Sequence, residues 1–249
     1  MAEVYETGDV AFLYRPQVDE SEPEGLGDLQ QVALVLRPHG DGWRQIVLGE
    51  KQLPHPEESG SDRNWAFVEA VGNSRQELEK SLSSETYETQ TRGSRTLPAY
   101  RPAGEGVYAI ARYHDEVRLL YDLELPAQRG EVQKTLNITQ QARLVLQVRN
   151  PEAEAPQGQG LAPERRADYP AHLRERFGGR QWIGADPPEL LDHPGAELAL
   201  IGAKANVPEQ LEQAVEPDDE DAQTADVFST LKLSREEHPS DPLFGHAWE

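Results

Sequence analysis

The chain has 249 residues, of which 45 are acidic and 24 are Lys or Arg, so its formal net charge is −21. It contains no cysteine, which excludes disulfides, thiolate metal ligands and cysteine nucleophiles. The acidity lies at the two ends. Residues 1–90 (7 basic, 18 acidic) and 186–249 (3 basic, 16 acidic) carry −11 and −13, whereas residues 91–185 (14 basic, 11 acidic) carry +3. Charge of this size bears on solubility and non-specific binding, and not on fold.

Nothing in the sequence suggests a membrane protein. No segment approaches the roughly 20 consecutive apolar residues that cross a bilayer. The first residues, Met1–Thr7, are polar and lack the pattern of a secretory leader. We therefore expect a soluble, cytoplasmic protein with no membrane partner.

Short segments rich in aliphatic, β-branched and aromatic residues follow one another along the chain, separated by Gly, Pro, Asp and His. Such spacing predicts a mostly β fold, an antiparallel β-sandwich or barrel. Apart from a central hairpin, the expected strands are Val10–Tyr14, Val32–Leu36, Trp43–Leu48, Trp65–Val71, Leu144–Val148 and Glu197–Ile201.

The central hairpin has the clearest pattern. Residues alternate between apolar and polar from Val107 to Tyr113, and a polar turn follows at His114–Glu116. Beyond the turn, every second residue is apolar, and Pro126 ends the strand because it cannot donate to a ladder. This apolar stripe consists of Val117, Leu119, Tyr121, Leu123 and Leu125.

Only a few short helices are expected. Ser74 and Glu77 have the spacing of a capping box, which predicts a helix that carries Leu78 and Leu82 on one face. Pro170 is a favourable helix start, and Gly178 is a favourable end. Two further helices are expected at Pro208–Val215 and Asp226–Leu231.

These patterns give a mostly β domain over residues 1–204 and an acidic C-terminal extension with short helices over residues 205–249. The Pro- and Gly-rich segment 150–163 is either an internal domain boundary or a long surface loop. Residues 19–27, rich in acid, Gly and Pro, are expected to form an exposed loop.

Arginines cluster in the basic middle of the chain. If two clusters met in space, their guanidinium groups could bind phosphate or carboxylate. Nucleic acid is a less favoured partner, because a net charge of −21 repels a polyanion. The alternative is that the arginines pair with the protein's own carboxylates. The candidates for anion binding are Arg92, Arg95, Arg101, Arg165, Arg166 and Arg180.

The acidic extension also carries apolar and aromatic side chains, which in such a setting often dock in a groove. We expect this tail to dock on its own β core, where it would cover an edge strand. Docking on a partner protein is the alternative. The candidate docking residues are Phe228, Leu231, Leu243, Phe244 and Trp248.

No motif of catalysis, metal binding or cofactor binding is present. There is no nucleophile elbow, no phosphate-binding glycine loop and no pair of histidines with ligand spacing, so no metal or cofactor is expected. The sequence favours a non-enzymatic binding or assembly protein that acts through β-sheet surfaces and its tail, with a protein partner or self-association. Two alternatives stay open: an anion or nucleic-acid binder that uses the arginines, and a hydrolase whose site residues lie far apart in sequence.

Overall fold

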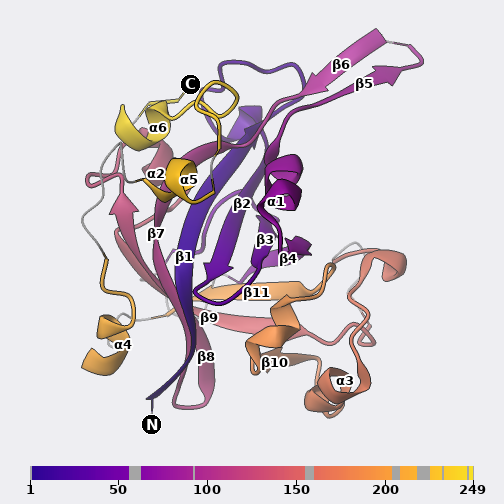
Figure 1. Cartoon of the computed structure of the whole chain (residues 1–249). Helices are drawn as coiled ribbons and strands as arrows, with labels where there is room; N and C mark the ends of the chain where they lie inside the picture. The colour runs from indigo at the N-terminus through magenta and orange to yellow at the C-terminus, as the bar shows by residue number, and fades with distance from the viewer. Residues whose placement is uncertain are drawn as a thin grey trace.

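The computed structural model describes residues 2–55, 63–91, 93–154, 160–203, 208–217, 225–231, 233–245 and 247–248. Eight of its strands form one closed antiparallel barrel (Figure 1). The predicted mostly β, antiparallel fold is confirmed, and of the two expected architectures it is the barrel. In order around the barrel, the strands are β1 (Ala2–Pro16), β2 (Leu29–Pro38), β3 (Trp43–Leu48), β4 (Arg63–Gly72), β11 (Glu197–Gly202), β9 (Gln141–Arg149), β8 (Glu116–Leu125) and β7 (Arg101–Tyr113), which returns to β1.

The remaining elements are short and lie outside the barrel wall. A two-stranded ribbon, β5 (Glu85–Thr89) and β6 (Gly93–Leu97), projects from one end (Figure 1), and β10 (Trp182–Gly184) pairs with the end of β9. None of the described helices has the length and apolar character needed to cross a bilayer. The helices are η1 (Leu26–Asp28), α1 (Arg75–Leu82), α2 (Glu131–Thr135), η2 (Pro163–Arg165), α3 (Ala171–Phe177), η3 (Pro188–Leu191), α4 (Glu209–Gln213), α5 (Asp226–Ser229) and α6 (Asp241–Phe244).

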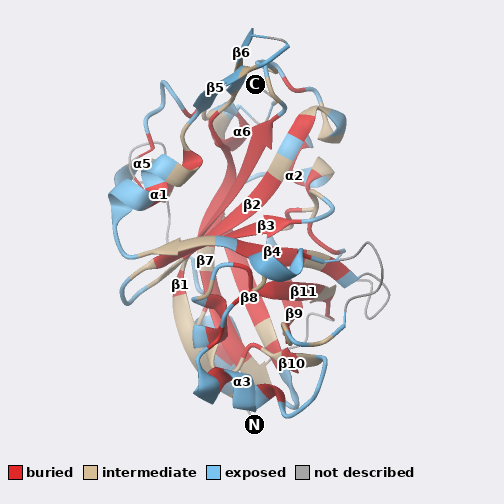
Figure 2. Ribbon diagram, turned by 90° about the vertical axis from the view of Figure 1, so that its right-hand side faces the viewer, coloured by how far each residue is buried: buried red, intermediate tan, exposed pale blue. Residues whose placement is uncertain are grey.

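Alternating side chains of the strands fill the barrel interior. Along β1, for example, Val10, Phe12 and Tyr14 join the central apolar cluster, and the ring of Phe12 meets that of Tyr121 on β8 edge to face, with centroids 4.9 Å apart. Figure 2 shows the strands as largely buried, in contrast to the exposed ribbon at the top. The interior is thus lined by packed apolar side chains, and the two hollows described below lie on the outer surface.

The predicted hairpin is present as β7 and β8, but its stripe is not continuous. Val117, Leu119, Tyr121 and Leu123 face the interior, whereas Leu125 belongs to the cluster on the outside of the barrel. A β-bulge opposite Glu105 shifts the register and causes this switch, because one extra residue turns all later side chains to the other face.

The outer wall is also apolar over β1, β2 and β3, and other elements cover it there. Helix α1 lays Leu78 and Leu82 on this surface, and its predicted capping box of Ser74 and Glu77 is present. Strands that are covered on both faces explain the unbroken apolar run Val32–Leu36, since neither set of side chains meets water.

Strand β9 divides its length between two neighbours on one side. Residues up to Val145 pair with β8, and Gln147, Val148 and Arg149 pair with β10. On the other side of β9 lies β11, which joins it to β4. Although the segment 150–163 follows β9, the later strand β11 therefore belongs to the same barrel.

Candidate functional site: a tryptophan-lined pocket on the barrel wall

The outer face of β4, β11, β9 and β10 carries a pocket of about 590 Å³. In the ladder, Trp65 of β4 lies beside Ala199 of β11, and Arg149 of β9 lies beside Trp182 of β10. The small side chain of Ala199 lies between the two larger walls, which leaves a hollow. Two tryptophans, one from each edge of this four-strand face, therefore line a single concavity of the size typical of small-molecule sites.

Arg63 connects the two walls of the pocket. Its guanidinium carbon lies 5.9 Å from the ring centroid of Trp182, although Arg63 belongs to β4 and Trp182 to β10. On the opposite wall, the ring of Trp65 packs directly on the backbone of Gly49. A Cβ at position 49 would lie only 2.6 Å from Cε3 of Trp65. Gly49 therefore permits the position of the Trp65 ring.

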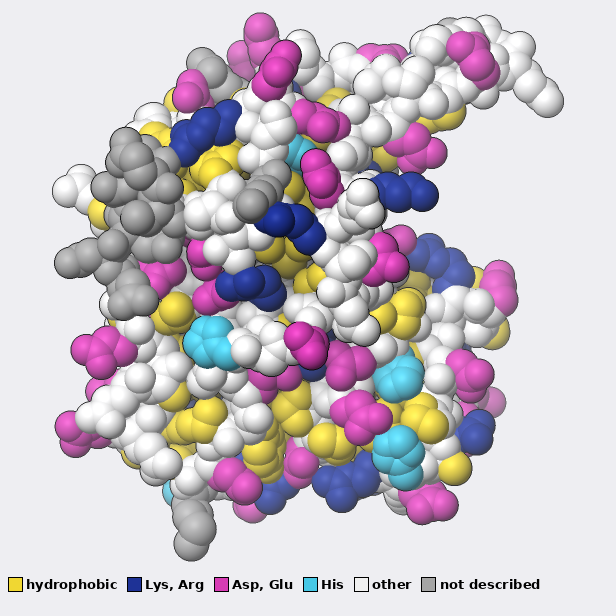
Figure 3. Space-filling view, viewed as in Figure 1, with side chains coloured by type: hydrophobic (Ala, Val, Ile, Leu, Met, Phe, Trp, Pro, Cys, Tyr) yellow, Lys and Arg dark blue, Asp and Glu magenta, His cyan; other side chains and the backbone are white. Residues whose placement is uncertain are grey.

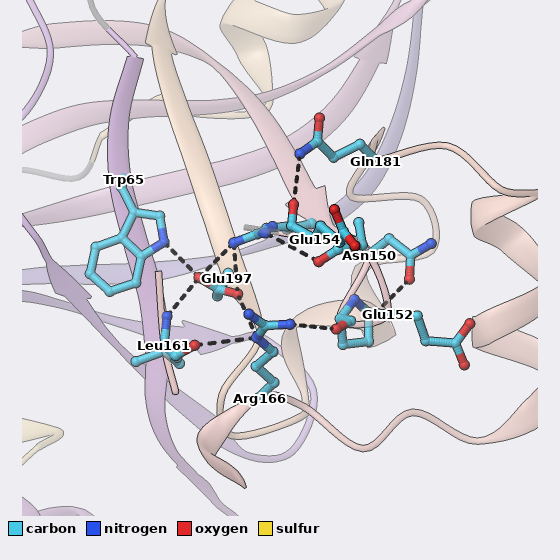
Figure 4. A network of polar contacts seen from close by, with 11 residues as sticks. Trp65, Asn150, Glu152, Glu154, Leu161, Arg166, Gln181 and Glu197 are labelled. Carbon is cyan, nitrogen blue, oxygen red and sulfur yellow. Dashed lines mark hydrogen bonds and ion pairs between the residues drawn. The ribbon is translucent and has the colours of Figure 1, made fainter. Parts of the chain in front are cut away.

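A buried carboxylate anchors the pocket from behind (Figure 4). Glu197 is 2% exposed, and its Oε1 accepts hydrogen bonds from Nε1 of Trp65 at 3.1 Å and from the amide of Leu161 at 2.9 Å. Nη1 of Arg149 lies 3.3 Å from both carboxylate oxygens, and Nε of Arg166 lies 3.8 Å from Oε2. Every described partner of Glu197 is thus a donor.

The two arginines of this network are fixed by backbone carbonyls as well. Arg149 donates from Nη2 to the carbonyl of Ala153 at 3.2 Å, and Arg166 donates from Nη1 to that of Pro151 at 3.0 Å. Nε of Arg149 is buried and has no hydrogen-bond partner within the described residues. The network itself therefore holds two arginines, Arg149 and Arg166, against the one carboxylate of Glu197.

A second hollow, of about 620 Å³, lies between the β7–β8 turn and the α3–β10 region. Its arginines are engaged by the protein itself. Arg112 and Arg176 both pair with Asp186, while Arg180 donates to the carbonyls of Phe177 and Arg176. The lining also includes Asp115 and Glu175, so its cations and anions balance.

The structure does not bring together the five predicted arginines that it describes. Arg95 lies on β6 and pairs with Asp19, and Arg180 follows α3; Figures 1 and 2 show these elements at opposite ends of the molecule. Arg101 is buried and donates to the carbonyl of Ser21 at 2.8 Å. Arg165 lies 3.4 Å from Glu69. Arg166 belongs to the Glu197 network, and Arg92 lies outside the described residues.

The tail residues pack on the barrel of their own chain. Leu231 and Leu243 are buried in the outer cluster, and Phe228 and Phe244 are half-buried against it. Trp248 packs on the ring of Tyr14, with centroids 5.3 Å apart.

Hydrogen bonds between the tail and the rest of the chain also hold the tail in place, and they were not predicted from the sequence. Glu105 accepts the amides of Asp226 and Val227, and Gln133 donates to the carbonyl of Pro242. His238, 1% exposed, lies 2.6 Å from the carbonyl oxygen of Tyr100. Each pair joins residues more than 100 positions apart, so no local pattern could have indicated it.

The described residues contain no group of three or more His, Asp or Glu side chains that could hold a metal ion. One trio has the residue types of a catalytic triad: Thr7 Oγ1 lies 3.2 Å from Nδ1 of His39, and Nε2 of His39 lies 3.6 Å from Asp9. The imidazole is 62% exposed, however, and Asp9 is also paired with Arg37, so the trio is not the buried, dedicated arrangement of a catalytic triad.

Comparisons with protein-family models, curated proteins and solved structures found no match.

Proposed function

We propose that this chain is a non-enzymatic binding protein that takes a ring-bearing carboxylate in the pocket between Trp65 and Trp182. The observation that carries the proposal is the convergence of two indoles and the Arg63 guanidinium on one hollow of about 590 Å³. Indole rings supply a broad flat surface for a ring, and a guanidinium supplies paired donors for a carboxylate.

The charges around the pocket favour an anion over a cation. Arg63 and Arg149 line it, and Arg166 lies behind it, against the two carboxylates of Glu50 and Glu197. This local excess of positive charge occurs in a chain of net charge −21. Long-range repulsion therefore disfavours large polyanions, while a small monoanion can still be held at short range.

Binding without catalysis is supported by the state of Glu197. A general base needs a free oxygen within reach of a substrate proton. Glu197 instead receives hydrogen bonds from Trp65, Leu161 and Arg149 and is 2% exposed. The carboxylate acts as a structural brace for the pocket walls in this proposal.

Isothermal titration and tryptophan fluorescence with four probes test it: glucuronate, glucose, benzoate and benzylamine. We expect glucuronate and benzoate to bind, glucose to bind more weakly, and benzylamine not to bind. Trp182→Ala should weaken both carboxylates roughly tenfold, because a stacked ring is worth about 1–3 kcal/mol. Arg63→Ala should weaken them to a similar degree and leave glucose unchanged, since a hydrogen bond to a charged group is worth roughly 1.5–3 kcal/mol.

Tyr87→Ala is the control, because Tyr87 is an exposed aromatic on the distant ribbon. It should bind every probe as the wild type does. The proposal fails if no probe binds at millimolar concentration, or if Trp182→Ala binds the carboxylates with unchanged affinity.

A further inference from the structure

The ribbon of β5 and β6 stands apart from the barrel, and its strands are the most exposed of the described strands (Figures 2 and 3). It forms a two-stranded sheet of its own. Tyr87, near its middle, is 41% exposed and is the one large hydrophobic side chain in the exposed class among the described residues. An isolated two-stranded ribbon is marginally stable in water, and further strand pairing would stabilise it.

The hydrogen bonds at the base of the ribbon identify its free edge. Thr96 of β6 accepts from the amide of Asp19 and donates to the Asp19 carboxylate, both at 2.9 Å, so its backbone groups point away from β5. In an antiparallel pair, hydrogen-bonded and non-hydrogen-bonded residue pairs alternate. Thr86 lies opposite Thr96, and Glu88 lies opposite Ser94. The backbone groups of Thr86 and Glu88 therefore point outward along the edge of β5.

Asp19 occupies part of the β6 edge, and the amide of Ser84, the residue before β5, donates to Glu237 at 3.0 Å. The outward groups of Thr86 and Glu88 have no such partner within the described residues. A strand edge of this kind is a template for pairing with another strand.

We propose that β5 pairs with β5 of a second copy of this chain, antiparallel and about a twofold axis at Tyr87, to form a continuous four-stranded sheet. In this register Thr86 exchanges backbone hydrogen bonds with the partner's Glu88, and the same bonds recur on the other side of the axis. The two Tyr87 side chains become a non-hydrogen-bonded cross-strand pair with Cα atoms about 4.5 Å apart, and aromatic cross-strand pairs are stabilising. This inference is independent of the proposed ligand pocket.

The sequence Glu85-Thr86-Tyr87-Glu88-Thr89 selects this register. Centred on Tyr87, it places Glu88 opposite the partner's Thr86 and Glu85 opposite the partner's Thr89, so no two carboxylates face each other. A shift that centres the axis on Glu88 would oppose two glutamates, which is destabilising. A register with the axis at Thr86 would pair the amide of Ser84 with the second copy, but that amide already donates to Glu237.

The net charge of the chain and the small area buried by strand pairing together set the strength of this dimer. Residues 85–97 contain two glutamates and two arginines, so the ribbon adds no net charge in a chain of −21. The bodies still repel each other at long range, and salt screens that repulsion. Pairing of one short strand buries little area, as in transient complexes. We expect a weak dimer that strengthens as the salt concentration rises.

The experiment is sedimentation velocity on the full chain over a range of concentrations at low and high salt. Thr86→Lys places an ammonium opposite the partner's Glu88 twice per dimer and should tighten association roughly tenfold, whereas Thr86→Glu should abolish it. Both variants lose the same Thr86–Thr96 side-chain contact, so they are matched.

Proline provides a second matched pair. Glu88→Pro and Ser94→Pro remove the outward amides of two residues that lie opposite each other in the ribbon. Only Glu88→Pro, on the β5 edge, should abolish the dimer. A wild type that stays monomeric at the highest concentration in high salt overturns the proposal. So does a dimer that Thr86→Glu and Glu88→Pro leave intact, which would point to another face.

Discussion

The carboxylate of Glu105 on strand β7 accepts the backbone amide of Val227 at 2.8 Å, and that of Asp226 at 3.0 Å. Glu105 is 1% exposed and thus lies beneath the start of α5. A buried acid from the barrel therefore satisfies amide groups that the first turn of a helix leaves without partners.

We expect Glu105→Ala to detach the tail before the barrel unfolds. The change leaves two amides without their acceptor, and buried unsatisfied groups of this kind cost about 1–3 kcal/mol each. Limited proteolysis should show faster cleavage within residues 208–245, and the free energy of unfolding in urea should fall. Glu131→Ala, an exposed acid on α2, is the control. Equal cleavage rates in the two variants would contradict the anchoring role.

In the Glu197 network we expect the loss of the acid to be more damaging than the loss of one base. Glu197→Ala leaves Arg149 as a buried unpaired cation, and breaking a buried ion pair costs roughly 3–5 kcal/mol. Arg166→Ala should cost less, because its side chain is 17% exposed and Arg149 still pairs with the acid. Urea unfolding of both variants measures the difference. A milder effect for Glu197→Ala would show that the network contributes little to stability.

The buried tyrosines predict a loss of stability at alkaline pH. Burial raises the pKa of Tyr100 to about 12, and it also raises the pKa values of Tyr108, Tyr121 and Tyr169. Such a tyrosine ionises near pH 10 in the unfolded chain but stays protonated in the fold. The contribution of such a tyrosine to the free energy of unfolding is therefore fully present below pH 10. For Tyr100 this contribution is lost as the pH rises from 10 to 12.

Thermal unfolding against pH and tyrosinate absorbance check this together. We expect at least these four of the eight tyrosines to ionise only as the fold is lost. Reversible ionisation of all eight near pH 10, with the circular dichroism unchanged, would be incompatible with their burial.

Gly106 is expected to be indispensable for the contact between β7 and β8. A Cβ at this position would lie 2.1 Å from the carbonyl oxygen of Asp122, beside the bulge opposite Glu105. Gly106→Ala should therefore lower the free energy of unfolding by at least about 1–3 kcal/mol, the usual effect of overpacking. At Gly40 a Cβ would meet nothing within 4 Å, so Gly40→Ala is the matched control. Calorimetric melting of the two variants should separate them clearly.

Local patterns in the sequence were sufficient for elements that are stabilised locally. The alternation on both sides of the His114 turn predicted the hairpin, and Ser74 with Glu77 predicted the cap of α1. The ribbon was missed because Glu85–Thr89 has no apolar alternation, since neither face of it is buried.

The candidate pocket was beyond sequence reasoning for a different reason. Trp65 and Trp182 are far apart in the chain, and they line one pocket from opposite sides only because β11 and β9 lie between their strands. Glu197 likewise was one of 45 acids with no distinguishing neighbour in sequence. Closure of the barrel, and not any motif, brings these side chains together.

The position of β11 has a consequence for synthesis on the ribosome. Before Glu197–Gly202 is made, β4-β3-β2-β1-β7-β8-β9 is an open sheet whose two outer strands each lack a neighbour. The strand that joins those edges is translated last, and the tail that covers the outer wall follows it. A nascent chain thus exposes unpaired edges and apolar surface for most of its translation, which are the features that recruit chaperones and promote aggregation. Chains truncated before residue 197 should therefore accumulate as aggregates.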